Sequence, residues 1–424
     1  MIKFLLKGLL RDRSRSLFPV LTVSLGVLLT VFFYCYILGI AGNMLQTSAK
    51  LGSGHVRVTT RAYAEEADQL PNDLALTGVG ALVAGLRRDH PSLVWTTRIR
   101  FGGLLDVPDE RGETKAQGPV AGIAADLLTP GSAEPGILGL EVALVRGRLP
   151  EEKTEILVSD EFASRLGLEP GGTVTLISST MYGSLATANF TLAGTVRFGL
   201  AALDRGTMVA DVAAVQDVLD MSGAAGEVLG FFPDEIYREE EAGALAASFN
   251  SARPATTDPF APMMDTLRNQ SGLGEMLDLF KVVAGVFIAL FIAAMAVVLW
   301  NAGLMGHIRR YGEIGVRLAM GESKGHVYRS MIGESLLIGL GGTVIGSAVG
   351  LALAYWLQVH GIDMSGLFEN ASILMTTRIR ARVTPAAFFI GFAPGLLATL
   401  LGSAMAGLGI YKRQTSRLIK ELEA

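Results

Sequence analysis

Four long apolar stretches separate the parts of this chain that can cross a membrane from the parts that cannot. They are Leu17–Leu45 near the N-terminus, and Val282–Gly306, Met331–Leu357 and Val383–Tyr411 near the C-terminus. An apolar run of about 20 residues forms a helix that crosses the roughly 30 Å hydrocarbon layer. Each stretch exceeds that length, so the pattern predicts four transmembrane helices, one followed by three.

A polar block, Gln46–Lys281, lies between the first and second stretches and has the mixed pattern of a globular domain. Alternating apolar residues predict strands over His55–Thr60, over Leu93–Asp106 as two strands around Gly102 and Gly103, and over Glu155–Ser159, Thr173–Ser178 and Phe190–Phe198. Helical spacing predicts helices over Val79–Arg88, Asp160–Leu166, Val212–Leu219 and Ile236–Phe249. We therefore expect an α+β domain, large enough for two subdomains.

The end of this block leads back to the membrane. Ser251–Pro262 contains three prolines and predicts a loop. Met263–Lys281 resumes a helical pattern and runs into the second apolar stretch, so we expect it to form a stalk together with the first transmembrane helix.

Charge predicts the orientation of these segments. Residues 1–16, 307–330 and 412–424 are rich in Lys and Arg, whereas 46–281 holds 19 basic and 32 acidic residues. Because basic residues gather on cytoplasmic flanks, both termini are predicted inside and the large domain outside. Arg378, Arg380 and Arg382 oppose this pattern, because they precede the fourth stretch on the predicted outer side.

The expected division of the chain follows from hydropathy and charge together. It is 1–16 as a cytoplasmic segment, 17–45 as the first transmembrane helix, 46–281 as the extracytoplasmic domain with its stalk, 282–306 as the second helix, 307–330 as a cytoplasmic loop, 331–357 as the third helix, 358–382 as an outer loop, 383–411 as the fourth helix and 412–424 as a cytoplasmic tail. The apolar face of the first ten residues predicts a helix lying in the inner interface, with an ordinary basic flank as the alternative.

Several kinds of chemistry are absent from the sequence. No Lys follows a Gly, so the phosphate-binding loop GxxxxGK[ST] of ATPases is missing and we expect no ATP hydrolysis by this chain. Cys35 is the only cysteine and excludes an intramolecular disulfide. Gly321–Gly325 matches the serine-hydrolase pattern GxSxG around Ser323, but its place between two apolar stretches favours a helix-breaking turn.

Residues within the apolar stretches suggest how the helices pack. Gly342, Gly346 and Gly350 recur every fourth residue in the third stretch, and Gly391 and Gly395 do so in the fourth. Such faces let helices approach closely. Glu334 is an intramembrane carboxylate near one end of the third stretch. It is interpreted as a boundary residue that orients the helix, with contact to the loop or a partner, or a proton relay, as alternatives.

The segment between the second and third stretches carries the most specific pattern. Arg310, Glu313, Ile314, Gly315, Arg317, Ala319 and Gly321 follow the order Arg, acidic residue, Ile-Gly and basic-Ala-Leu-Gly, with one residue inserted in Arg317–Gly321. Together with Gly52–Val58, Arg146–Pro150 and Glu155–Leu176, this resembles the MacB, LolC/LolE and FtsX family of ABC-transporter permeases, and the lipoprotein-releasing branch in particular.

The resemblance implies a non-catalytic membrane subunit whose short coupling helix docks on a separate ATPase. The coupling residues would be Arg310, Glu313, Ile314, Gly315, Arg317, Leu318 and Gly321. The implied partners are two ATPase copies, a second permease copy or paralogue, the lipid bilayer, and a periplasmic carrier or adaptor. No nucleic acid is expected, and ATP and Mg²⁺ would be used by the ATPase rather than bound here.

The function implied is release of lipoproteins or another hydrophobic cargo from the inner membrane, driven by movement of the outer domain. Two alternatives stay open at this point. One is an efflux permease that works with a periplasmic adaptor, and the other is an FtsX-like transmitter that activates an outer hydrolase and moves no cargo.

Overall fold

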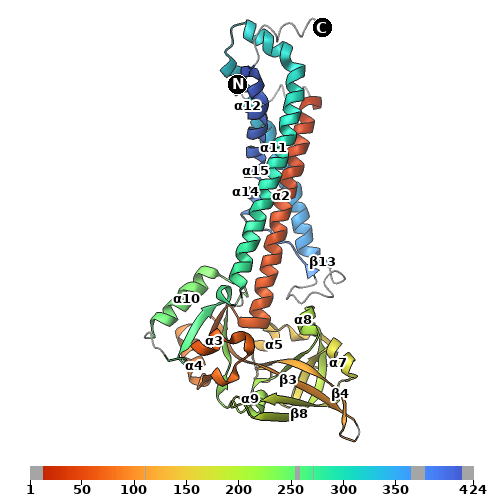
Figure 1. The fold of residues 1–424 in the computed structure, drawn as a ribbon, viewed down its shortest axis with the longest axis vertical. Coiled ribbons are helices and arrows are strands. Elements are labelled where there is room, and N and C mark those ends of the chain that lie inside the picture. The colour runs from red at the N-terminus through yellow and green to blue at the C-terminus, as the bar shows by residue number, and fades with distance from the viewer. Residues whose placement is uncertain (1–12, 110, 254–257, 271, 364–377, 413–424) are drawn as a thin grey trace. The chain divides into compact units, whose positions relative to one another are not determined.

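The computed structural model describes residues 13–109, 111–253, 258–270, 272–363 and 378–412 of the chain (Figure 1). The chain divides into two compact units. A membrane unit comprises residues 1–42, 277–362 and 379–424, and an α/β unit comprises residues 43–276 and 363–378.

The membrane unit is built from long helices that lie side by side (Figure 1). They are α2 (Arg13–Thr47), α11 (Leu273–Ala319), α12 (Lys324–His360), and the pair α14 (Ala387–Ile390) and α15 (Phe392–Lys412). The segments long and apolar enough to cross a membrane are Leu17–Ser53, Leu273–Ala302, Lys324–His360 and Ala387–Gly407. The predicted arrangement of one span followed by three is therefore confirmed.

The helix bounds differ from the predicted segments at the hairpin between the second and third spans. α11 is a single helix of 47 residues and stays helical through most of the segment expected to be a loop. No proline interrupts 307–319, so the backbone has no local reason to stop before Gly321. By contrast, the fourth span breaks between α14 and α15, because Pro394 lacks an N–H and its ring crowds the carbonyl four residues earlier.

The α/β unit contains one ten-stranded sheet, which includes a closed ring. Its strands are β1 (Val56–Thr60), β3 (Val94–Pro108), β4 (Thr114–Ala125), β5 (Leu144–Gly147), β6 (Glu155–Ser159), β7 (Thr173–Ser179), β8 (Leu185–Val196), β9 (Thr207–Asp211), β11 (Glu227–Phe231) and β12 (Pro262–Thr266). The path runs β12-β1-β11-β3-β4-β9-β6-β8-β5. Because β7 pairs with both β3 and β8, the strands β3, β4, β9, β6, β8 and β7 close on themselves.

Short helices surround this sheet. They are α3 (Arg61–Glu65), α4 (Val79–Asp89), α5 (Glu134–Ile137), α6 (Leu140–Ala143), α7 (Asp160–Leu166), α8 (Ala201–Asp204), α9 (Val212–Val218) and α10 (Glu239–Ser251). The main apolar core includes the fully buried side chains Phe101, Leu105, Phe162, Leu176 and Leu192. A smaller cluster around Leu138, Leu140, Leu157 and Val196 packs against Leu51.

Several predicted elements of this unit are confirmed and others are wrong. The structure has the expected strands and helices around β1, α4, β6, α7, β7 and α9, with Gly167 ending α7 in the left-handed region. The expected pair of strands over Leu93–Asp106 is instead one strand, β3, in which Gly103 admits the neighbouring strand: a Cβ there would lie 2.7 Å from the Ile177 carbonyl oxygen.

The helical pattern assigned to Met263–Lys281 is also wrong at its start. Pro262–Thr266 forms β12, which pairs antiparallel with β1 from Thr60 opposite Pro262 to Val56 opposite Thr266. Helix resumes at Leu273. Pairing with β1 supplies backbone partners that a local pattern does not report, so tertiary structure overrides the local preference here.

The two subdomains expected for this block are not separate bodies. β3 is 15 residues long, and its first half pairs with β11 in the open part of the sheet. Its second half pairs with β4 and β7 in the closed ring. One strand therefore belongs to both parts of the sheet.

Candidate functional site: the coupling hairpin and the polar joint

The segment that resembles a coupling helix is the hairpin between α11 and α12. Arg310, Glu313, Ile314 and Gly315 lie on α11, and their side chains fall outside the described part of the structure. Leu318 packs with Met331 around the buried side chain of Val327, so the two helices are held together at the turn. The segment is thus a packed helical hairpin, and its role in docking an ATPase stays a prediction.

The turn itself explains two residues that the sequence pattern singled out. Gly321 has φ +92°, the Gly321 N–H donates to the Leu318 carbonyl, and the Glu322 N–H donates to the Arg317 carbonyl. This is a Schellman motif, in which the left-handed residue is usually glycine. Ser323 then caps α12 by accepting a hydrogen bond from the His326 N–H, so this serine has a structural task.

The predicted glycine faces are contact faces between helices. A Cβ on Gly346 would lie 2.4 Å from the carbonyl oxygen of Ser24 on α2, and Gly342 and Gly350 face the same helix at Val23 and Leu28. Gly391 and Gly395 face α12 instead, where a Cβ would lie 2.6 Å from Ser347 Oγ and 2.1 Å from Thr343 Oγ1 respectively. The glycines of α12 therefore bring α12 into backbone contact with α2, and those of the fourth span let side chains of α12 and α2 pack directly on it.

Glu334 lies on α12 beyond the hairpin and is half-buried. It shares this helix with the glycine face, which begins two turns later at Gly342. Its interpretation as a boundary residue stays a prediction.

The α/β unit begins with a second candidate site, a polar joint at the end of the first membrane helix. α2 continues into η1 (Ser48–Ser53), a π-helix of six residues that stops at Gly54 with φ +67°. The last carbonyls of a helix have no donor within the helix and need one from elsewhere. Arg98 of β3 supplies it, because its Nη1 donates to the Lys50 carbonyl over 2.6 Å.

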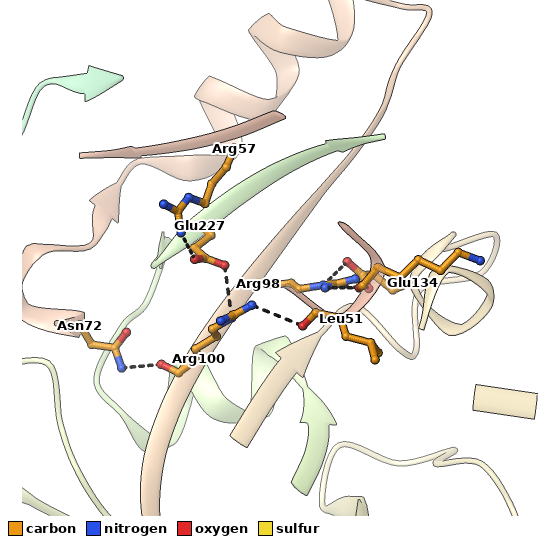
Figure 2. Close-up of polar contacts among 8 residues, drawn as sticks. Leu51, Arg57, Asn72, Arg98, Arg100, Glu134 and Glu227 are labelled. Atoms are coloured by element: carbon orange, nitrogen blue, oxygen red, sulfur yellow. Dashed lines mark hydrogen bonds and ion pairs between the residues drawn. The ribbon is translucent and has the colours of Figure 1, made fainter. Parts of the chain in front are cut away.

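Arg98 is itself neutralised by a buried carboxylate (Figure 2). Its Nε lies 2.9 Å from Glu134 Oε1 and its Nη2 lies 2.8 Å from Glu134 Oε2, and both side chains are 0% exposed. A forked pair of this kind is strong and directional. The two residues together present an electrically neutral donor to the end of η1, which a single buried cation could not do.

A second ion-pair chain lies beside the first (Figure 2). Glu227 of β11 binds Arg57 of β1 over 3.0 Å and lies 3.6 Å from Arg100 of β3. Arg100 Nη2 donates to the Leu51 carbonyl over 3.3 Å. Three strands therefore hold the end of η1 through two arginines that point to the same side of β3. We call Arg98, Glu134, Arg100 and Glu227 the polar joint.

Sequence reasoning missed the polar joint. A signal for it was present, since Arg98 and Arg100 alternate within Val94–Phe101, the part of β3 whose other residues are apolar or β-branched. Glu134 and Glu227 stand far from these arginines in sequence, so nothing local identified the partners.

A buried histidine, His55, lies two residues beyond the end of η1. His55 Nδ1 accepts the Phe232 N–H over 2.9 Å, and the imidazole stacks on the Phe232 ring with the centroids 5.3 Å apart. Burial lowers the pKa of His55 to about 4, although the carboxylates of Asp234 and Glu235 act in the opposite direction. His55 is therefore neutral at physiological pH, and it packs against Phe232 in the interior of the α/β unit.

The segment Arg146–Pro150, singled out as a family signature, is structural in this fold. Arg146 Nε binds Asp160 over 2.8 Å, and Arg148 forks onto Glu155. Gly147 has φ +76°, and a Cβ there would lie 2.2 Å from a carbonyl oxygen of β8. The signature thus fixes the edge strand β5 to β8. Within the described residues, no cluster of three or more His, Cys, Asp or Glu side chains could hold a metal ion.

Known proteins similar to this chain include membrane proteins that match its three C-terminal spans. Residues 285–415, which include α12, the hairpin and the fourth span, match the model of the FtsX-like permease C-terminal domain. The transmembrane proteins LolC of the lipoprotein-releasing systems of Xylella fastidiosa strains Temecula1 and 9a5c are each 28% identical to the chain over 208 residues. The match covers 48% of this chain and 48% of either relative, so it spans about half the length of the curated relatives.

Among solved structures, the periplasmic region of MacB from Actinobacillus actinomycetemcomitans aligns with a TM-score of 0.36 at 11% identity. The alignment covers 57% of this chain and 95% of that one. The permease-domain match, the LolC relatives and the one-plus-three order of the spans around an inserted α/β unit agree with one another. The chain carries an FtsX-like permease domain at residues 285–415 and is similar to the LolC transmembrane proteins over about half of its length.

Proposed function

We propose that this chain is the membrane subunit of an ABC transporter that releases lipoproteins from the inner membrane. The observation that carries the proposal is the match to the FtsX-like permease domain over 285–415, a region that holds the whole hairpin. The sequence lacks the phosphate-binding loop of an ATPase, which favours a separate subunit as the source of energy. The LolC relatives support lipoprotein as the cargo.

In this proposal the hairpin faces the cytoplasm and docks on the ATPase. The basic flanks at 1–16, 307–330 and 412–424 support that orientation, which puts the α/β unit on the outer side of the membrane. Ile314 and Leu318 are four residues apart on α11 and therefore share a helical face. Leu318 packs against Val327 within the hairpin, so Ile314 is the apolar residue proposed for a groove on the partner. Arg310, Glu313 and Arg317 offer charges for pairing around that face.

Movement would travel along continuous backbone from the hairpin to the α/β unit. α11 runs without a break from Leu273 to Ala319, and α2 runs without a break into η1. The glycine faces lock α2 to α12, so displacement of the hairpin displaces α2 as well. The polar joint then passes that displacement to β3, and through β3 to both parts of the sheet.

The proposal is tested by reconstituting the full chain with its cognate ATPase and partner permease in liposomes that contain an inner-membrane lipoprotein. We expect ATP-dependent release of lipoprotein to the aqueous phase, and no ATP turnover by this chain alone. Glu313→Lys and Ile314→Asp should reduce recruitment of the ATPase or lower release per ATP at least tenfold, with membrane insertion intact.

Glu240→Lys on α10 is the matched control, because it makes the same charge change at an exposed site of the α/β unit. Release that is equal in all variants would contradict the coupling role of the hairpin. An assembled, ATP-hydrolysing complex that releases no lipoprotein would contradict the proposed cargo.

A further inference from the structure

A row of arginines precedes the fourth membrane span, on the side that the other basic segments predict to be the outer one. Arg378, Arg380 and Arg382 occupy alternate positions of a segment that leads to α14. Arg380 and Arg382 are exposed, and Ala381 between them is 3% exposed. The guanidinium group of Arg382 lies along α2, because a Cβ on Gly42 would stand 3.3 Å from its Nη1.

The backbone that carries these two arginines is fixed on α2 and on the end of α12. The Arg382 N–H donates to the Cys35 carbonyl of α2 over 2.9 Å, and the Val383 N–H donates to Gln358 Oε1 of α12 over 2.8 Å. A Cβ on Gly39 would lie 2.0 Å from the Arg380 carbonyl oxygen, so α2 accommodates the segment only because a glycine stands there. The row is therefore positioned by the fold.

Aromatic residues indicate the depth of the row in the membrane. Tyr355 and Trp356 on α12 are 61% and 54% exposed, at the end of the helix away from the hairpin. Tyr and Trp are enriched where a membrane meets water. Gln358, which binds the Val383 N–H, lies half a turn beyond Trp356. Arg380 and Arg382 thus lie at the level of the lipid headgroups.

Neither guanidinium has an acidic partner within the part of the chain that the structure describes. The arginines therefore stand at an interface, held in place by backbone contacts and without an acidic partner among the residues that the structure describes. The guanidinium fork matches the geometry of a phosphate and hydrates weakly. We propose that Arg380 and Arg382 bind the phosphate of an anionic phospholipid in the leaflet at this end of the membrane unit.

This proposal is tested through Trp356, which reports the lipids beside it. The full chain carrying Trp300→Phe is placed in phosphatidylcholine nanodiscs with a small fraction of brominated phosphatidylglycerol or, separately, brominated phosphatidylcholine. Bromine quenches tryptophan, and the remaining Trp95 is buried in the α/β unit. A basic residue near a charged surface contributes about fivefold in binding, so two predict roughly 25-fold preference for phosphatidylglycerol.

Arg380→Gln/Arg382→Gln should remove this preference, and each single variant should remove part of it. Arg88→Gln/Arg111→Gln is the control, because it deletes two exposed arginines of the α/β unit and should retain the preference. Equal quenching by the two lipids in the parent chain, or a preference that survives in the Arg380/Arg382 variant, would overturn the proposal. Loss of the preference in excess inorganic phosphate, but not in chloride of equal ionic strength, would mean that the site binds free phosphate and would also overturn it.

Discussion

Arg98 and Glu134 illustrate how a buried charge can serve a fold at the scale of a single residue. Removing both charges from water is costly, and a buried pair is by itself weak evidence of stabilisation. Here the pair has a further task, because Arg98 also satisfies the Lys50 carbonyl at the end of η1. An apolar pair of the same volume could fill the space but could not donate to that carbonyl.

We therefore expect Arg98→Met to destabilise the α/β unit by about 3–5 kcal/mol, because Glu134 would be left buried without its partner. Arg98→Met/Glu134→Leu should recover most of this loss, leaving about 1–3 kcal/mol for the unsatisfied Lys50 carbonyl. Chemical unfolding of the full chain in detergent, followed by Trp95 fluorescence in a Trp300→Phe/Trp356→Phe background, measures both values. Arg88→Met at an exposed site is the control. A double variant less stable than the single one would contradict this account.

His55 gives the α/β unit a dependence on pH. Its pKa is about 4 in the folded chain and about 6.5 when unfolded, so between these values the unfolded state binds more protons. Stability is therefore complete above about pH 6.5 and falls as the pH drops toward 4, by a total of about 3 kcal/mol.

His55→Gln keeps a hydrogen-bond acceptor for the Phe232 N–H but cannot titrate. Unfolding of parent and variant is compared at pH 7.5, 5.5 and 4.5. The variant should be less stable at pH 7.5 and should lose less stability on acidification. An identical loss in both proteins would exclude His55 as the source.

At the scale of elements, close contact between helices determines how the membrane unit packs. Gly346 of α12 meets the backbone of α2, whereas Gly341 of the same helix has no atom within 4 Å of where its Cβ would stand. Intrinsic helix preference favours alanine equally at both positions, so any difference between them comes from packing.

Gly346→Ala is expected to destabilise the membrane unit by about 1–3 kcal/mol, because the added methyl would force α12 away from Ser24. Gly341→Ala should be neutral or slightly stabilising. Thermal unfolding of the full chain in detergent, with the yield of folded protein, distinguishes the two. Equal midpoints for both variants would show that the glycine face is not a tight contact.

At the scale of the whole molecule, the α/β unit is an insertion within the membrane unit. The chain leaves the membrane unit along α2 and returns along α11. In the proposed function, a displacement of these helices would reach the α/β unit through helical backbone, which is stiffer than a flexible linker.

The orientation of the two units is tested by labelling. In a Cys35→Ser background, single cysteines are placed at exposed Ser184 in the α/β unit, at exposed Met320 in the hairpin turn, and at Ser416 in the tail. Because the basic flanks favour an inner hairpin, an impermeant thiol reagent on cells with a permeabilised outer membrane should label only position 184. Labelling at 320 or 416 before the inner membrane is disrupted would reverse the orientation.

The sequence by itself determined the elements whose physical cause is local. Long apolar stretches predict four spans whichever helices they later pack against, because the prediction depends only on the length and apolar character of each stretch. The number and order of the spans therefore agree with the structure. Short elements with clear ends, such as α7 with Gly167 after it, also follow from nearby residues alone. The glycine pattern similarly marked contact faces, although the sequence did not say which helix each face meets.

Tertiary structure decided what depends on partners far along the chain. β12 replaces a predicted helix because β1 offers it hydrogen bonds, and β3 stays unbroken through Gly102 and Gly103 because β4 pairs with it across both glycines. The polar joint needs Glu134 and Glu227 beside Arg98 and Arg100. Antiparallel pairing of β11 with β3 brings Glu227 there, and the packing of α5 brings Glu134 to Arg98. Pairing across such distances depends on the folded arrangement of the whole unit, and no local pattern encodes it.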